Sequence, residues 1–251
     1  MNRCRLETIR AYWSGRVVAY SAVNADELGT IQAKVWDELI AEQLPWKHPL
    51  RILDAGCGPG FFSILMARRG HEITGVDYSE AMIECARENI ENHSPEASAY
   101  FSQMDAQDLT FEDDTFDVVL SRNLTWNLEH ADWAYADWLR VLRPGGRLVN
   151  FDGNHDRHLD SEPYAEELKQ PDYTDGHNPD FMLGVDPAPI HAIAANLPLS
   201  RVDRPQWDVE TLLKLGARNV TVDVERKHFV DGTGQPVSII KRFMVSAQKE
   251  E

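Results

Sequence analysis

The sequence predicts a doubly wound α/β fold built on a largely parallel sheet, and three observations lead to this prediction. From residue 50 to residue 152, short apolar runs typical of strands alternate with segments of helical spacing. This alternation requires crossover connections, which give parallel strands with helices on both faces. Near the C-terminus, two strand-like runs flank the turn-forming residues 231–236, so a closing antiparallel hairpin is expected. The 251 residues, 43% of them apolar, suffice for one such domain.

The expected elements follow one another with short connections. A helix over residues 26–44 precedes the first strand, which begins at residue 50 and runs into a glycine turn. Asp26, Ser79 and Asp208 stand just before helical patterns and are expected N-caps. The later predicted strands are 71–77, 99–105, 116–121, 146–152, 219–227 and 237–247, and the later helices are 61–70, 79–93, 131–146 and 208–217.

Residues 153–206 break this rhythm, because they are rich in Pro, Asp and His and contain few apolar runs. A connection of this length in a compact domain is more often a lid or a binding segment than a plain surface loop. We therefore expect a single domain with four parts: an N-terminal helical cap (1–47), a ligand-binding core (48–152), a lid insertion (153–206), and a closing helix and hairpin (207–251).

Composition disfavours several classes of protein. The formal net charge is −16 and no cluster of Lys and Arg is present, which argues against a nucleic-acid partner. No apolar stretch approaches the roughly 20 residues of a membrane helix, and residues 1–10 contain no apolar signal core, so a cytoplasmic location is expected. The cysteines at positions 4, 57 and 85 are too few and too far apart for a disulfide framework or a structural zinc site.

A glycine-rich turn at residues 54–60 carries the strongest signal for a ligand. Glycines between a strand and a helix let a ligand approach the backbone at the carboxyl edge of the sheet. The dinucleotide fingerprint G-x-G-x-x-G is the competing interpretation, but its third glycine would fall on Phe61. A bulky residue fits poorly where a helix must pack closely on a strand, so the turn departs from the dinucleotide fingerprint and its glycines follow the pattern G-x-G-x-G.

Two acids follow the next two predicted strands. Asp77 ends the second strand, where a carboxylate can accept hydrogen bonds from both hydroxyls of a ribose. Asp105 follows the third strand between Met104 and Ala106, where it could accept a bond from an adenine amino group beside an apolar neighbour. Together these acids indicate an adenosine ligand, although alone each has a structural reading as a helix cap or a loop acid.

Five segments in this order and spacing resemble class I S-adenosylmethionine-dependent methyltransferases: LDAGCGPG, ITGVDYS, MDAQDL, FDVVLS and LRVLRPGGRLVNFD. The resemblance is nearest to the group that includes quinone-biosynthesis methyltransferases. It covers residues 48–152 well, the N-terminal helix loosely, and residues 153–206 hardly at all. It implies a Rossmann-like seven-stranded sheet whose last strand is antiparallel, with S-adenosylmethionine as the cofactor and a small molecule as the methyl acceptor.

The resemblance also implies roles for particular residues. The methionine portion would lie on Asp54, Gly56 and Gly58, the ribose on Asp77 beside Tyr78, and the adenine on Met104, Asp105 and Ala106. Near the sulfonium would lie Ser121 and Arg122. Tyr12, Trp13, Arg16 and Tyr20 resemble N-terminal segments that close over the cofactor, with Arg16 pairing its carboxylate. The alternative for these four residues is ordinary packing.

The acceptor is less well indicated. The sequence SRNLTWN after the fourth strand departs from the Asn/Asp-Pro-Pro-Tyr pattern of enzymes that methylate adenine or glutamine amides, which argues against those substrates. His155 is the expected general base or substrate contact, because histidine can deprotonate an O–H or N–H near neutral pH. His158 and His177 are expected substrate contacts, and no metal is expected because the histidines lack tight ligand spacing. Trp126, Phe181, Met182 and Trp207 are expected to form an aromatic pocket or to pack the lid over a planar or amphiphilic metabolite.

Three alternatives remain at this point. A nicotinamide-dependent oxidoreductase would use a similar sheet, and cofactor binding separates it. A catalytically silent partner subunit would keep the fold and lose turnover. A protein or nucleic-acid methyltransferase is disfavoured by the acidic charge. The sequence leaves open the acceptor, the methylated atom, and whether the protein is a monomer or a homodimer.

Overall fold

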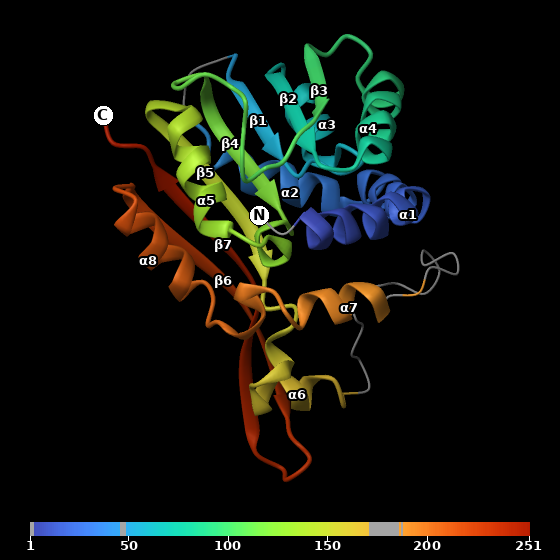
Figure 1. The fold of residues 1–251 in the computed structure, drawn as a ribbon, viewed down its shortest axis with the longest axis vertical. Helices are drawn as coiled ribbons and strands as arrows, with labels where there is room; N and C mark the ends of the chain where they lie inside the picture. The colour runs from blue at the N-terminus through green and yellow to red at the C-terminus, as the bar shows by residue number, and fades with distance from the viewer. Residues whose placement is uncertain (1–2, 46–48, 171–185, 187) are drawn as a thin grey trace.

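A seven-stranded sheet forms the centre of the computed structural model, which describes residues 3–45, 49–170, 186 and 188–251. The strand order is β3-β2-β1-β4-β5-β7-β6, and β1 to β5 pair in parallel. β7 runs antiparallel to both of its neighbours, β5 and β6. The predicted parallel sheet with an antiparallel last strand is therefore confirmed (Figure 1).

The strands are β1 (Arg51–Ala55), β2 (Glu72–Asp77), β3 (Ala99–Gln103), β4 (Phe116–Arg122), β5 (Leu142–Gly153), β6 (Arg218–Val230) and β7 (Pro236–Gln248). The helices are α1 (Arg3–Leu28), α2 (Ile31–Ala41), α3 (Phe61–Arg68), α4 (Glu80–His93), α5 (Ala131–Val141), α6 (Glu162–Glu167), α7 (Ala188–Ala194) and α8 (Gln206–Lys214). Short 3-10 turns are η1 (Thr125–Asn127), η2 (Arg157–Leu159) and η4 (Pro198–Arg201).

The two faces of the sheet carry separate hydrophobic cores. On one face, Trp138 of α5 and Leu212 of α8 are fully buried against the sheet. On the other, Ile40 of α2, Phe62 of α3 and Ile83 of α4 form the second core. Each fully buried aliphatic or aromatic side chain stabilises the fold by roughly 1.5–3 kcal/mol relative to exposure. Two covered faces are what the continuous apolar strands required.

The N-terminal region differs from the prediction, because α1 is a single helix of 26 residues. Its buried face includes Arg16 and Asn24 as well as Leu6 and Ile9. Because two of these buried residues are polar, the spacing of apolar residues alone does not show that the segment is a helix. The predicted cap at Asp26 is wrong, because it lies inside α1. Thr30 caps α2 instead, its side chain accepting a hydrogen bond from the backbone N–H of Gln32.

Two other predicted boundaries also shift. Ser79 is confirmed as the N-cap of α4, its hydroxyl accepting a hydrogen bond from the backbone N–H of Met82. Asp208 is not a cap, because α8 begins at Gln206 and the Asp208 carboxylate is fully buried against Arg204. α5 ends at Val141 rather than residue 146, because β5 already begins at Leu142.

The described parts of residues 153–206 contain η2, α6, α7 and η4, so this segment is not a plain loop. α6 lies against the outer part of the β6–β7 hairpin, where Glu167 pairs with Lys241 at 2.6 Å (Figure 1). α7 packs against α1. The predicted site residues His177 and Phe181, and also Met182, lie outside the described residues. Among the residues described, no helix has both the length and the apolar character needed to cross a bilayer.

Candidate functional site

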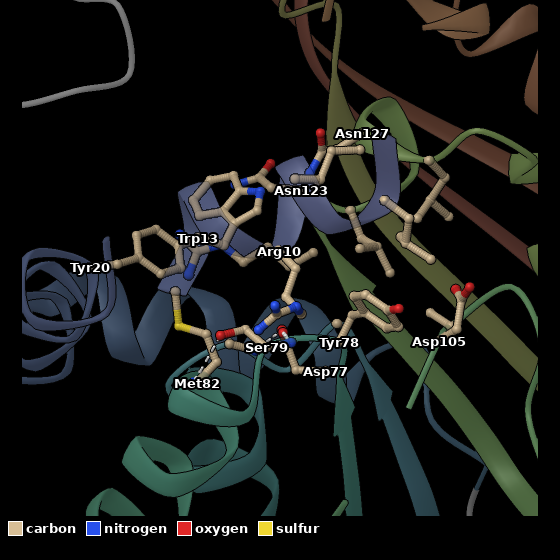
Figure 2. Close-up of a pocket in the computed structure, with 18 residues that line it drawn as sticks. Arg10, Trp13, Tyr20, Asp77, Tyr78, Ser79, Met82, Asp105, Asn123 and Asn127 are labelled. Atoms are coloured by element: carbon tan, nitrogen blue, oxygen red, sulfur yellow. Dashed lines mark hydrogen bonds between the residues drawn. The ribbon is translucent and has the colours of Figure 1, made fainter. Parts of the chain in front are cut away.

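A pocket opens at the carboxyl edge of the sheet, between the strand ends and helix α1 (Figure 2). Its volume is about 750 Å³, including the part open to solvent. The core of the domain provides the floor and α1 provides the cover. Predicted residues that line it are Tyr20, Gly56, Gly58, Asp77, Tyr78, Asp105, Ala106 and Arg122.

The glycine turn after β1 brings bare backbone to the pocket. Gly56, Gly58 and Gly60 all have positive φ angles, of 70°, 50° and 89°, a region that side-chain-bearing residues rarely adopt. A Cβ on Gly56 would lie 2.7 Å from a side-chain carbon of Leu124. Glycine at position 56 is therefore required both by the backbone and by the residue that overhangs it.

Asp77, at the end of β2, is held in place by the backbone. One carboxylate oxygen accepts a hydrogen bond from the N–H of Gly58 at 3.0 Å, and the other from the N–H of Ser79 at 2.8 Å. Burial beneath α1 raises the pKa of Asp77 to about 6, although these two bonds oppose the rise. The carboxylate lines the pocket, so its remaining lone pairs can receive a ligand's hydroxyl groups.

Asp105 is fixed in a similar way at the other end of the pocket. Its Oδ1 accepts hydrogen bonds from the backbone N–H and the side-chain amide of Gln107, at 2.9 and 3.0 Å. The neighbouring Ala106 is buried, and its carbonyl accepts a bond from the indole of Trp138. Met104 is partly buried against the core behind these two residues and does not line the pocket.

Arg122, at the end of β4, joins the sheet to the cover. Its guanidinium donates to both carboxylate oxygens of Glu27 in α1, at 2.9 and 3.0 Å. It also lies over the rings of Trp36 and Phe61, 4.6 and 4.7 Å from their centroids. This combination of a bidentate ion pair and aromatic contacts orients the arginine and fixes the C-terminal part of α1 over the pocket.

Five other predicted cofactor residues are not among those that line the pocket. Asp54 lies beneath the glycine turn and accepts a hydrogen bond from Ser63 at 2.7 Å; burial raises its pKa to about 6. Ser121 is fully buried within β4, and residues 116–120 are buried as well, because both faces of the sheet are covered. Tyr12 and Arg16 are buried against the rest of the fold, and Met104 packs on the core as described above.

Several pocket residues were missed from the sequence. Leu6, Ile9 and Arg10 of α1 line the pocket at the spacing of one helix face, together with Trp13, which the resemblance had already indicated. Reading residues 3–28 as a helix would have identified that face. The loop after β4 contributes Asn123, Leu124, Asn127 and Leu128. Its polar residues were visible in SRNLTWN, but nothing in the sequence indicates which of them face the ligand.

The predicted acceptor residues lie beyond this loop. Trp126 does not line the pocket; its indole N–H donates to the carbonyl of Asn123 at 2.8 Å, and its ring packs on His155 with centroids 5.0 Å apart. His155 Nε2 lies 3.4 Å from the buried carboxylate of Asp152. His158 is half-buried in η2, and Trp207 stacks on Tyr135 in the core. In the described part of the chain, no group of three His, Cys, Asp or Glu side chains is arranged to hold a metal ion.

Comparisons with known proteins agree with this arrangement. Residues 52–146 match the family model described as "Methyltransferase domain". The chain is similar to a phosphatidylethanolamine N-methyltransferase of Cereibacter sphaeroides, with 35% identity over 99 residues that cover 39% of this chain and 48% of the relative. It is also similar to a demethylmenaquinone methyltransferase of Clavibacter sepedonicus, with 36% identity over 99 residues and 39% of each chain covered. The chain thus spans less than half the length of these two relatives.

The fold also resembles a solved structure. A SAM-dependent methyltransferase from Aquifex aeolicus superposes with a TM-score of 0.54 at 16% identity, and the match covers 85% of this chain and 89% of the other. At this identity the likeness concerns the fold. Residues 52–146 are therefore similar to a methyltransferase domain, and the whole chain has a fold like that of the solved Aquifex aeolicus structure.

Proposed function

We propose that this protein binds S-adenosylmethionine and transfers its methyl group to a small-molecule acceptor. The arrangement of Asp77, the glycine turn and Asp105 along one pocket supports this proposal most directly. Two anchored carboxylates and bare backbone suit a ligand with ribose hydroxyls and an adenine amino group. The residues of α1 that line one side of the pocket would reduce the access of water to aligned reactants, which favours an in-line displacement.

The residues present fit this cofactor. Asp77 would accept hydrogen bonds from the ribose hydroxyls, and Asp105 from the adenine amino group beside Ala106. The backbone at Gly56 and Gly58, where a side chain would intrude, would lie along the methionine portion. Bound S-adenosylmethionine supplies a methyl carbon activated by its sulfonium. Arg16 was expected to pair with the carboxylate of the cofactor, but it does not line the pocket. Arg10 and Arg122 do line it, and we propose that they pair with this carboxylate.

His155 remains the proposed proton acceptor for an acceptor molecule that must lose a proton. The buried Asp152 carboxylate holds one ring nitrogen, and the Trp126 ring packs on the imidazole face. Burial alone would raise the pKa of Asp152, but the Arg204 guanidinium 2.8 Å away, together with His155 and the Thr125 hydroxyl, lowers that pKa well below its usual range. Asp152 is therefore an anion at neutral pH and can orient the imidazole.

The identity of the acceptor is a separate part of the proposal. The relatives' names refer to a phospholipid amine in one case and to a quinone precursor in the other, while the family match covers residues 52–146. We propose a free small molecule rather than nucleic acid, because the formal net charge of −16 disfavours a polyanion. A cytoplasmic monomer or homodimer completes the proposal.

Calorimetric titration with S-adenosylhomocysteine tests the cofactor assignment, with NAD titrated in parallel. We expect S-adenosylhomocysteine alone to bind. Asp77→Ala removes the acceptor of two hydroxyl hydrogen bonds and is expected to weaken binding by at least about 100-fold, since bonds to charged groups contribute about 1.5–3 kcal/mol each. Asp108→Ala is the matched control, because Asp108 is exposed and does not line the pocket.

Binding of NAD in place of S-adenosylhomocysteine would contradict the proposal and favour an oxidoreductase. Turnover is then measured as release of S-adenosylhomocysteine from S-adenosylmethionine in the presence of pooled metabolites. Tight cofactor binding without turnover across such pools would favour a silent partner subunit.

A further inference from the structure

The side-chain amide oxygen of Asn127 is a buried polar atom without a hydrogen-bond partner in the part of the chain that the structure describes. Asn127 is 6% exposed and lines the pocket, and its Oδ1 has no hydrogen-bond partner among the described residues. A buried acceptor without a partner costs about 1–3 kcal/mol, and native proteins rarely retain one without a functional reason. A ligand N–H or O–H in the pocket would remove this cost.

The turn that carries Asn127 is held rigidly from behind. The backbone N–H of Asn127 donates to the carbonyl of Leu124 at 2.9 Å. Thr125 donates its hydroxyl to Asp152, and the backbone N–H of Trp126 donates to the same carboxylate at 3.0 Å. The amide is therefore presented by a fixed element, and a contact made by it requires little ordering when a ligand binds.

The strand order places this turn at the donor end of the pocket. The proposed adenine and ribose contacts follow β3 and β2, and the proposed methionine contacts follow β1. β4 is the next strand along the same edge, and the turn with Asn123 and Asn127 follows it. Figure 2 shows Asn123 and Asn127 on the side of the pocket across from Asp77, Tyr78 and Asp105.

The conformation of Asn123 also supports a role of this turn in ligand binding. It has a φ of 52°, a left-handed conformation that residues other than glycine seldom adopt, and its carbonyl is occupied by the indole of Trp126. This backbone conformation leaves the Asn123 side chain in the pocket lining beside that of Asn127. Strained backbone of this kind is retained where the surrounding structure fixes it, often at ligand sites.

We propose that Asn127, with Asn123 beside it, is the recognition contact for the methyl acceptor, and that the acceptor carries an O–H or N–H donor next to the atom that is methylated. This inference rests on the proposed function. The Oδ1 oxygen only accepts hydrogen bonds, so a carboxylate or phosphate at that position of the acceptor would not satisfy it.

Sinefungin provides a probe for this contact before any acceptor is known. In this analogue a carbon bearing an amine replaces the sulfonium and its methyl group, so its N–H donors mark the position from which the acceptor approaches. S-adenosylhomocysteine has no donor there. The ratio of the two dissociation constants therefore isolates contacts at the donor end from contacts to adenosine and the amino acid portion.

The experiment measures both affinities by calorimetry for the wild-type protein, Asn127→Leu, Asn127→Asp and the matched control Asn92→Leu, whose asparagine is exposed on α4. We expect Asn127→Leu to weaken sinefungin about tenfold or more relative to S-adenosylhomocysteine, as befits one hydrogen bond to a charged group. Asn127→Asp keeps the acceptor and adds charge, so it should shift the ratio in favour of sinefungin. Thermal unfolding verifies that each variant is folded.

An unchanged ratio in both Asn127 variants would overturn the inference. Equal weakening of both ligands would also overturn it, because it would make Asn127 a contact for the cofactor's common parts. If neither ligand bound the wild-type protein, the proposed function would fail and the inference with it. Failure of the inference alone is thus distinguishable, since S-adenosylhomocysteine still binds the wild-type protein in that case.

Discussion

The raised pKa of Asp77 makes cofactor affinity depend on pH in a defined direction. Burial raises this pKa to about 6 in the free protein. Ribose hydroxyls that donate to the carboxylate favour its ionised form, so the bound state should return the pKa toward its ordinary value of about 4. Binding then requires loss of a proton at acidic pH, and affinity must rise as pH increases through 6.

The size of the effect follows from these two values. At pH 5 the free protein holds Asp77 protonated about ten times as often as ionised, whereas the bound protein holds it mostly ionised. S-adenosylhomocysteine should therefore bind about tenfold more weakly at pH 5 than at pH 7.5. Binding at pH 5 should release about 0.8 protons, and binding at pH 7.5 almost none.

Calorimetry in pairs of buffers with different ionisation enthalpies measures both the affinity and the proton release. Asp77→Asn removes the titrating group and should abolish the pH dependence. Asp54→Asn should preserve it, because Asp54 does not line the pocket although burial also raises its pKa to about 6. Wild-type affinity that is constant from pH 5 to 7.5, or tighter at pH 5, would refute this reasoning.

Three further substitutions probe the framework of the site. Arg204→Met leaves two fully buried carboxylates without their guanidinium, and we expect a loss of roughly 3–5 kcal/mol in the free energy of unfolding, measured in urea. Gly56→Ala places a Cβ 2.7 Å from Leu124, so it should lower both the melting temperature and the affinity for S-adenosylhomocysteine. Gly70→Ala is the control, because Gly70 has a similar φ but no atom within 4 Å of the added Cβ, and it should leave affinity unchanged. Glu27→Gln weakens the anchor of α1 and should speed proteolysis within that helix at unchanged global stability of the sheet; an unaltered cleavage rate would contradict this anchoring role.

The parts of the site that could be predicted from the sequence are those that local structure determines. A glycine turn directly after a buried strand fixes where backbone is exposed, and an acid at the next strand end, Asp77, must lie at the same edge. The pocket contains these residues and Asp105 as expected. No long-range contact is needed to place them, because parallel strands deliver their carboxyl ends together.

The parts that were missed depend on contacts between distant residues. Asp208 looks like a helix cap until Arg204, itself close to Asp152, is seen to bury it. The sequence suggested Arg16 as an arginine of the ligand pocket. In the structure Arg16 lies on the buried side of α1, and Arg10 lines the pocket. Neither outcome is encoded in the spacing of the residues concerned, since both depend on how α1 and the inserted segment pack on the sheet.

The proposed cofactor side of the site is determined mainly by local structure, whereas the proposed acceptor side depends on contacts between distant segments. The family match ends at Gly146, before Asp152 and the inserted segment. Asp152 binds the turn that presents Asn127, and Arg204 at the end of the insertion binds Asp152 at 2.8 Å. The insertion is thereby coupled to the proposed acceptor side of the pocket through buried charges, while Asp77, Asp105 and the glycine turn all lie within the matched segment. A change of acceptor can then arise by altering residues after the match, without disturbing Asp77 or the glycine turn.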